Sequence, residues 1–252
     1  MSRSHDRAGV VAVSRRKQDP LAEVAPGVFM VRKTWGCNVF LIPGPRLCMI
    51  DAGFPLDTHA LSRLALSIDS SGPGMLVATH CHLDHMGSMA RLKRESGASV
   101  VAHKDDADTM EGKAPYRKFK LAPLQAVYYK LLGPLYPYEY VEVDRRLEDG
   151  DVIDVMGGLE VVHLPGHTEG SIALYQREMG ILFTGDTVRN ENNVLEGPPP
   201  QFTPNLERAY EGIAERLMPL DFSVLLPGHG DPVFKGAHDT VEMLLSGRQK
   251  RG

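Results

Sequence analysis

The sequence predicts an α/β domain, and three features of its 252 residues indicate this fold class. Apolar runs of strand length recur along the chain, and most of them end in Gly, Pro, Asp or His. Between these runs lie stretches whose apolar residues have helical spacing. The length suits one large domain or two small ones and can bury a sizeable core without disulfides. Strands and helices that alternate over such a length are typical of an α/β domain.

The first half of the chain begins with strands that we expect to pair antiparallel across turns such as Pro43-Gly44-Pro45. These strands are predicted over Val28–Val31, Val39–Ile42 and Leu47–Ile50. A helix over Leu56–Ile68 should end at the Gly- and Pro-containing residues 71–74. The elements expected next are a strand Met75–Thr79, a helix from about Asp84 to Glu95, and a strand Ser99–His103.

The second half follows a middle stretch that we expect to be irregular. Its predicted strands are Leu159–Leu164, Ser171–Tyr175, Ile181–Thr184 and Phe222–Leu226, and its predicted helices are Leu206–Leu217 and about Ala237–Leu245. Thr203 and Pro204 suit the cap and first turn of the earlier helix. The residues Leu-Pro-Gly-His occur at 164–167 and again at 226–229, each time after a predicted strand. This repeat suggests two equivalent loops at one site.

Composition narrows the classes of function. Three cysteines, Cys37, Cys48 and Cys81, are too few and too odd in number for a disulfide framework, so we expect reduced thiols in a cytoplasmic protein. No apolar run is long enough for a membrane span or an export signal. The net charge is −4 and basic clusters occur only at the ends, so no nucleic-acid partner is expected. We expect residues 1–20 to be a flexible segment and residues 21–252 to form a single domain.

The densest group of possible metal ligands lies within six residues, namely His80, His82, Asp84 and His85. In extended backbone alternate residues face the same side, so His80 and His82 can converge on one ion. Asp84 and His85 begin a predicted helix and can reach a second ion nearby. Taken singly, Asp84 can be a helix cap and a histidine at a strand end can simply make a hydrogen bond. Together they predict a metal site, because imidazole and carboxylate groups are zinc ligands.

Three further candidates follow strands downstream, each beside glycines that permit a sharp turn. They are His167 in Gly-His-Thr, Asp186 in Gly-Asp-Thr and His229 in Gly-His-Gly. Gly-Asp-Thr alone is usually only a turn. The order and company of all four segments favour a single shared site.

This succession of motifs, with Ile50-Asp51-Ala52-Gly53 before it, resembles the metallo-β-lactamase superfamily over about residues 26–232. It is similar in particular to the glyoxalase II-like and generalist bacterial metallo-hydrolase branch. The resemblance implies an αββα four-layer sandwich with the metals at one edge of the sheets. It also implies two Zn²⁺ per chain, with iron or manganese as alternatives.

Carried over from the resemblance, the first zinc would be bound by His80, His82 and His167. The second would be bound by Asp84, His85 and His229, and Asp186 would bridge both. Asp51 would orient a ligand, and Asp84 would also act as the catalytic proton acceptor. We expect His163 to be packed or hydrogen-bonded and Cys81 to be structural.

The resemblance implies a zinc-dependent hydrolase that cleaves a thioester, ester or lactone by attack of a metal-bridging hydroxide. The alternative is a non-haem iron oxidoreductase similar to persulfide dioxygenases. In the segment after Asp186 the chain differs from two groups of enzymes within this superfamily. Glyoxalase II enzymes have Gly-Arg-Phe there, and quorum-quenching lactonases have a tyrosine where this chain has Arg189. Residues 113–140 are rich in Leu and Tyr and are either a substrate lid or a contact in a homodimer.

Overall fold

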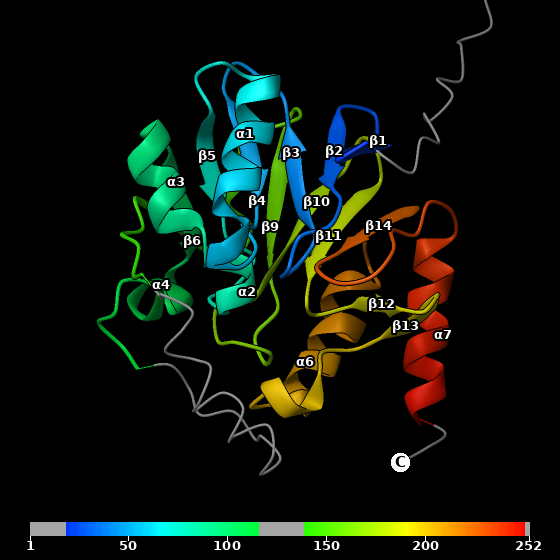
Figure 1. The fold of residues 1–252 in the computed structure, drawn as a ribbon. Coiled ribbons are helices and arrows are strands. Elements are labelled where there is room, and N and C mark those ends of the chain that lie inside the picture. Colours follow the sequence, from blue (N-terminus) through cyan, green and yellow to red (C-terminus); the bar gives the residue numbers. More distant parts are fainter. Residues whose placement is uncertain (1–18, 116–138, 250–252) are drawn as a thin grey trace, which may run out of the picture.

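The computed structural model describes residues 19–115 and 139–249, and its largest element is a seven-stranded sheet (Figure 1). Residues 116–138, which include most of the predicted lid or dimer contact, lie outside the described part. The strands lie in chain order: β1 Leu21–Ala25, β2 Val28–Val31, β3 Val39–Ile42, β4 Leu47–Ile50, β5 Pro73–Val77, β6 Ser99–His103 and β7 Arg145–Leu147. Neighbours are antiparallel from β1 to β4 and parallel from β4 to β7.

A second sheet has five strands in the order β14-β11-β10-β9-β8. Their bounds are β8 Val152–Ile153, β9 Leu159–His163, β10 Ile172–Gln176, β11 Ile181–Gly185 and β14 Val224–Pro227. Strand β10 is antiparallel to both β9 and β11, and β14 is parallel to β11. Strands β9, β11 and β14 therefore run in one direction, and their carboxyl ends meet at the same edge. A small hairpin of β12 Arg189–Glu191 and β13 Val194–Glu196 follows β11.

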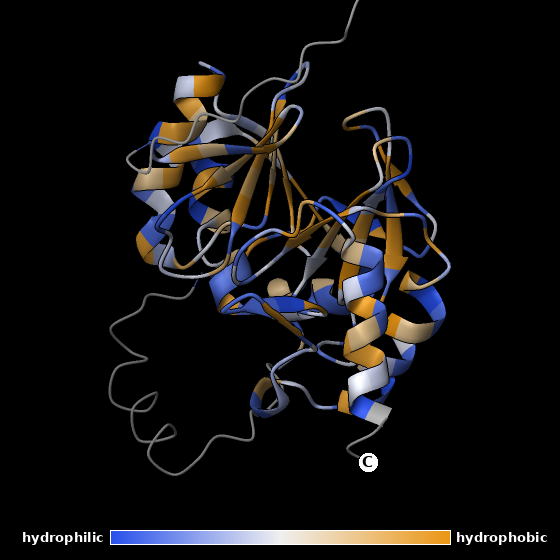
Figure 2. Cartoon of the chain, turned by 90° about the vertical axis from the view of Figure 1, so that its right-hand side faces the viewer, coloured by the Kyte–Doolittle hydropathy of each residue, from blue (hydrophilic) through white to orange (hydrophobic). Residues whose placement is uncertain are grey.

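Three groups of buried side chains separate four layers. The central group lies between the sheets, where the rings of Phe40 in β3 and Phe183 in β11 pack edge to face with their centroids 5.2 Å apart. A second group joins the first sheet to α1 Thr58–Ile68, α3 Met89–Ser96 and α4 Lys104–Met110. A third joins the second sheet to α6 Leu206–Gly212, the π-helical turn Ile213–Leu217 and α7 Ala237–Gln249. Figure 2 shows strands that are hydrophobic along much of their length and helices of mixed character. This arrangement confirms the predicted αββα sandwich.

Several elements differ from the prediction. The helix expected from Asp84 is two helices, α2 Leu83–Met86 and α3, separated at Gly87, where the backbone packs tightly on neighbouring main chain. The cap of α6 is Asn205, whose side chain accepts from the Arg208 amide, so the prediction for Thr203 was wrong. The middle stretch is not wholly irregular, because it contains α4, β7 and β8. Strand β1 and the β12–β13 hairpin were also missed. No helix in the described ranges is long and apolar enough to cross a bilayer.

Candidate metal centre

The candidate ligands lie where strands of both sheets end. His167 follows β9, Asp186 follows β11, and His229 follows β14, so three co-directional strands deliver them to one edge. The first sheet contributes His80 and His82 from the segment after β5. Asp84 and His85 are in α2, which begins directly after that segment. All seven predicted ligands therefore come together at one edge of the sandwich.

The segment that carries His80 and His82 is a bend and not the extended strand that we expected. Two buried carboxylates hold its main chain, since the Thr79 amide donates to Asp51 (2.8 Å) and the Cys81 amide donates to Asp106 (2.8 Å). Asp106 also accepts from Thr168 and Gly170 in the loop that carries His167. No sequence pattern points to Asp106, because a single aspartate in a short helix forms none.

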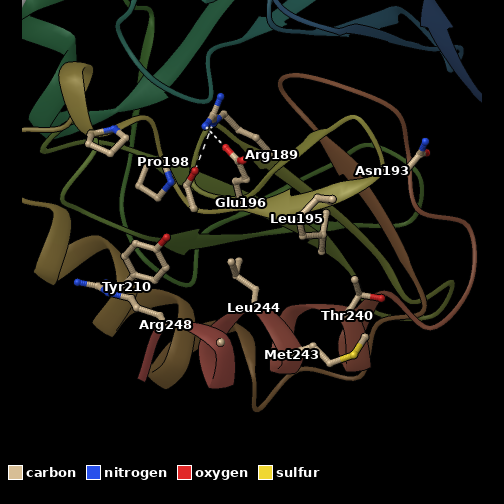
Figure 3. Close-up of a pocket in the computed structure, with 14 residues that line it drawn as sticks. Arg189, Asn193, Leu195, Glu196, Pro198, Tyr210, Thr240, Met243, Leu244 and Arg248 are labelled. Atoms are coloured by element: carbon tan, nitrogen blue, oxygen red, sulfur yellow. Dashed lines mark hydrogen bonds and ion pairs between the residues drawn. The ribbon is translucent and has the colours of Figure 1, made fainter. Parts of the chain in front are cut away.

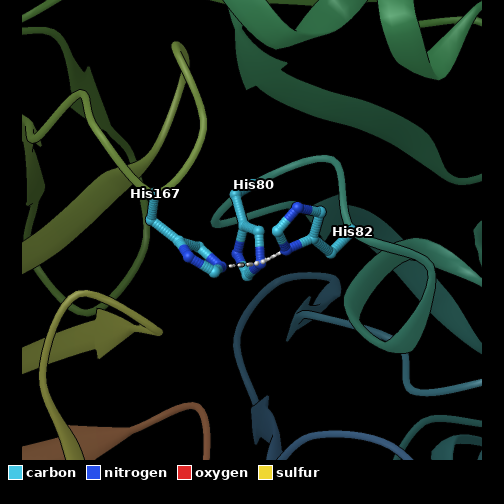
Figure 4. Close-up of side chains that lie close together, drawn as sticks. All are labelled: His80, His82 and His167. Atoms are coloured by element: carbon cyan, nitrogen blue, oxygen red, sulfur yellow. Dashed lines mark hydrogen bonds between the residues drawn. The ribbon is translucent and has the colours of Figure 1, made fainter. Parts of the chain in front are cut away.

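The first group consists of His80, His82 and His167 (Figure 4). The Nε2 of His80 lies 3.1 Å from the Nδ1 of His82 and 3.2 Å from the Nε2 of His167. Two tetrahedral ligands at about 2.0–2.1 Å from zinc would be about 3.3–3.4 Å apart. The three ring nitrogens thus have the spacing that one ion requires.

The second group consists of Asp84, His85 and His229. The Nε2 of His229 lies 3.3 Å from the Nε2 of His85 and 3.3 Å from a carboxylate oxygen of Asp84. The Nε2 of His85 lies 3.9 Å from the Oδ2 of Asp84. These distances also suit ligands of one ion.

Asp186 lies between the two groups. Its Oδ2 is 3.5 Å from His167, and its Oδ1 is 3.2 Å from His85 and 3.3 Å from His229. Oδ1 is buried and has no hydrogen-bond partner among the described residues. A buried carboxylate oxygen in that state is accounted for if it binds a cation. The donor set therefore fits two metal ions that share one carboxylate.

Comparison with known proteins identifies the family. The model of the metallo-beta-lactamase superfamily matches residues 32–229. The chain belongs to this superfamily. It is 29% identical over 217 residues to the probable metallo-hydrolase YflN of Bacillus subtilis, covering 78% of this chain and 81% of YflN.

Two further matches extend this result. The acyl-coenzyme A thioesterase MBLAC2 of Gallus gallus is 28% identical over 235 residues, which cover 79% of this chain and 78% of the relative. In fold, the chain resembles a metallo-beta-lactamase family protein from Thermus thermophilus, with a TM-score of 0.67 and 22% identity. That match covers 91% of this chain and 81% of the other.

Hydrogen bonds on the outer ring nitrogens orient three of the histidines in this member of the superfamily. His85 Nδ1 donates to Asp51 (2.8 Å), which is the role expected for Asp51. His80 Nδ1 lies 3.1 Å from the hydroxyl of Thr79, and His167 Nδ1 lies 3.0 Å from the hydroxyl of Thr203. The hydroxyls of Thr79 and Thr203 donate to Asp51 and to the Pro199 carbonyl, so they accept from the two imidazoles. The proton is then on the outer nitrogen in all three histidines, and Nε2 is free to bind a metal. The two threonines were not predicted as site residues.

Burial and charge prepare the groups for metal binding. Burial lowers the pKa of His80, His82 and His167, so these imidazoles are neutral at physiological pH. Burial opposes a charge on Asp84, but His85 and His229 hold its pKa at about 2. The first group thus presents neutral imidazoles and Asp84 an ionised carboxylate, the forms that bind zinc. Burial opposes a charge on His85 and His229 as well, but neighbouring acidic groups outweigh it and raise the pKa of both.

Three other features are distinct from the seven candidate ligands. His163 donates a hydrogen bond to the Glu169 carbonyl, and its ring stacks on that of His103 with the centroids 3.8 Å apart. His163 is thus packed and hydrogen-bonded, as expected. Cys81 lies in the core beneath the helices of the first sheet, as a structural residue should. A cavity of about 540 Å³ lies between the β12–β13 hairpin, α6 and α7 (Figure 3). None of the seven candidate ligands lines this cavity.

Proposed function

We propose that this chain is a zinc-dependent hydrolase of thioesters, with acyl-coenzyme A esters as the substrates to test first. The convergence of seven histidine and aspartate side chains in two groups that share Asp186 carries the proposal. The names of two relatives, a probable metallo-hydrolase and an acyl-coenzyme A thioesterase, support the reaction class. Simple esters and lactones belong to the same proposal as secondary substrates, because the chemistry at the carbonyl is the same.

His80, His82 and His167 would hold one zinc, Asp84, His85 and His229 would hold the other, and Asp186 would serve both. When bound, the ions would lower the pKa of water and polarise the substrate carbonyl. The four histidines nearest the core are buried, whereas the side chains of Asp84 and His229 are 29% and 27% exposed. These two residues therefore mark the open side of the site. The ionised Asp84 carboxylate can accept a hydrogen bond, and then a proton, from the attacking water.

The test is a hydrolysis screen of the purified full chain, with metal content measured on the same batch. The panel contains acyl-coenzyme A esters of increasing length, S-lactoylglutathione, acyl-homoserine lactones, aryl esters and nitrocefin. We expect the acyl-coenzyme A esters to react fastest and Asp84→Asn to lose most of the activity. His59→Ala is the matched control, because His59 is an exposed histidine on α1.

The iron oxidoreductase is the competing function. One stoichiometric iron with oxygen consumption, and no hydrolysis by zinc-loaded protein, would contradict the proposal. Hydrolysis of lactones or of S-lactoylglutathione in clear preference to acyl-coenzyme A esters would retain the hydrolase and reject its substrate class.

A further inference from the structure

The loop that carries His229 is held by two asparagines through five consecutive main-chain carbonyls. Asn38 directly precedes β3 of the first sheet, and Asn190 lies in β12, so the loop is gripped from two separate elements. The bonds are Asn38 N to Gly228 O (2.6 Å), Asn38 Nδ2 to Pro227 O (3.0 Å) and Gly230 O (2.7 Å), Asn190 N to His229 O (3.0 Å), and Asn190 Nδ2 to Asp231 O (2.7 Å).

The other side of this loop packs against the second group of ligands. A Cβ atom on Gly228 would lie 2.8 Å from both Asp186 Oδ1 and His85 Cε1. Gly230 has a φ of +83° and its backbone approaches Asn190 so closely that a side chain would collide with it. The main chain therefore runs between the ligands and the asparagines, and a displacement of the loop would move His229.

His229 differs from three of the other candidate histidine ligands in how it is oriented. In His80, His85 and His167 the outer ring nitrogen has a hydrogen-bond partner, namely Thr79, Asp51 and Thr203 respectively. Within the described residues, Nδ1 of His229 has no such partner. Its ring is also partly exposed, so packing restrains it less. The orientation of this ligand consequently depends on its main chain.

We infer that Asn38 and Asn190 are positioning residues for the second metal, and that they act by holding the backbone of His229; this inference rests on the two-metal site of the proposed function. The environment of Asn190 supports a role other than packing. It is 5% exposed, its Oδ1 is buried without a partner among the described residues, and it lies opposite Leu195 across the hairpin. Leucine is similar in size to asparagine, and it removes the buried amide oxygen that lacks a partner together with the bond to the Asp231 carbonyl. Asn190→Leu therefore removes the side-chain hydrogen bond to the loop and preserves the packing of the side chain.

The experiment measures zinc binding to the metal-free full chain by competition with a chelator, so that two binding steps are resolved. His229→Ala identifies the step that belongs to the second site. We expect Asn190→Leu and Asn38→Asp each to weaken that step about 10- to 100-fold, as is usual when a residue supporting a ligand is lost. The other step should not change, and excess zinc should restore occupancy.

Two matched variants complete the design. Thr203→Val removes the hydrogen-bond partner of His167. It should weaken zinc binding at the first site and leave binding at the second site unchanged, the opposite of the asparagine variants. Asn193→Gly removes an exposed asparagine from the same hairpin, at a φ of +63° that glycine accepts, and should change neither step. The melting temperature of metal-free Asn190→Leu should equal or exceed that of the wild type.

Unchanged binding at the second site in Asn190→Leu and Asn38→Asp would overturn the inference. Equal weakening of both steps would also overturn it, because a general loss of structure has that effect. If Asn38→Asp does not fold, Asn190→Leu alone decides, since its packing is expected to be preserved.

Discussion

Asp51→Asn tests whether one buried carboxylate supports both metal groups. Asp51 Oδ2 accepts from His85 Nδ1 (2.8 Å) and from the Thr79 hydroxyl (2.9 Å), and its Oδ1 accepts from the Thr79 amide (2.8 Å). The same hydroxyl lies 3.1 Å from His80 Nδ1. Asparagine keeps the size of the side chain and tolerates the φ of +57° at this position. It replaces one acceptor with a donor, so at least one of these bonds becomes a contact between two donors.

The magnitude follows from the bond that is lost. A hydrogen bond to a charged group contributes about 1.5–3 kcal/mol, which corresponds to about 10- to 150-fold in zinc affinity. We expect the larger loss at the second site, where Asp51 contacts His85 directly, and a smaller loss at the first, which it reaches through Thr79. Zinc titration against a chelator measures both. Wild-type affinity at both sites in a folded Asp51→Asn protein would refute this account of Asp51.

Three other predictions concern the same site. Asp186→Ala should lower zinc content at both sites, and adding His229→Ala should cost little more activity, because the ligands work as one unit; losses that multiply would show that Asp186 does not bridge. The second site should lose zinc first as the pH falls in a dialysis series, and earlier loss from the first site would count against the assignment. Burial lowers the pKa of His229, but Asp186 and Asp84 outweigh it and raise that pKa above its ordinary value. Burial lowers the pKa values of the first-group histidines. Protons therefore compete with zinc for His229 at a higher pH than for the first-group histidines. Gly228→Ala should deplete the second zinc by collision with Asp186 and His85, whereas Gly247→Ala, with no atom within 4 Å of the added Cβ, should not.

Four strands of the first sheet were predictable because their signals are local. The bounds of β2, β3, β4 and β6 agree with the apolar runs and turn residues that predicted them. The shortest elements were missed, since two- or three-residue strands such as β8 and β7 are too short to show a period. The break between α2 and α3 falls at Gly87, where a side chain would collide with Pro55 and Gly53, and no local pattern predicts such a contact.

The convergence of the seven candidate ligands was predictable because they are dense in sequence or stand beside a glycine just after a strand. Their supporting residues were mostly not. Thr203 looked like a helix cap from its neighbours, yet its hydroxyl contacts His167, which is 36 residues away in the chain. Asn38 contacts carbonyls about 190 residues away. A single threonine or asparagine has no distinctive pattern, so only the folded chain reveals such a long-range contact.

The most direct test of the central claim is the metal content of the purified full chain, measured together with thioester hydrolysis. Two zinc ions per chain are predicted, with hydrolysis lost on chelation and restored by Zn²⁺ or Mn²⁺. A protein that contains one iron and consumes oxygen, or that hydrolyses its substrate equally well after complete removal of metal, would contradict the account.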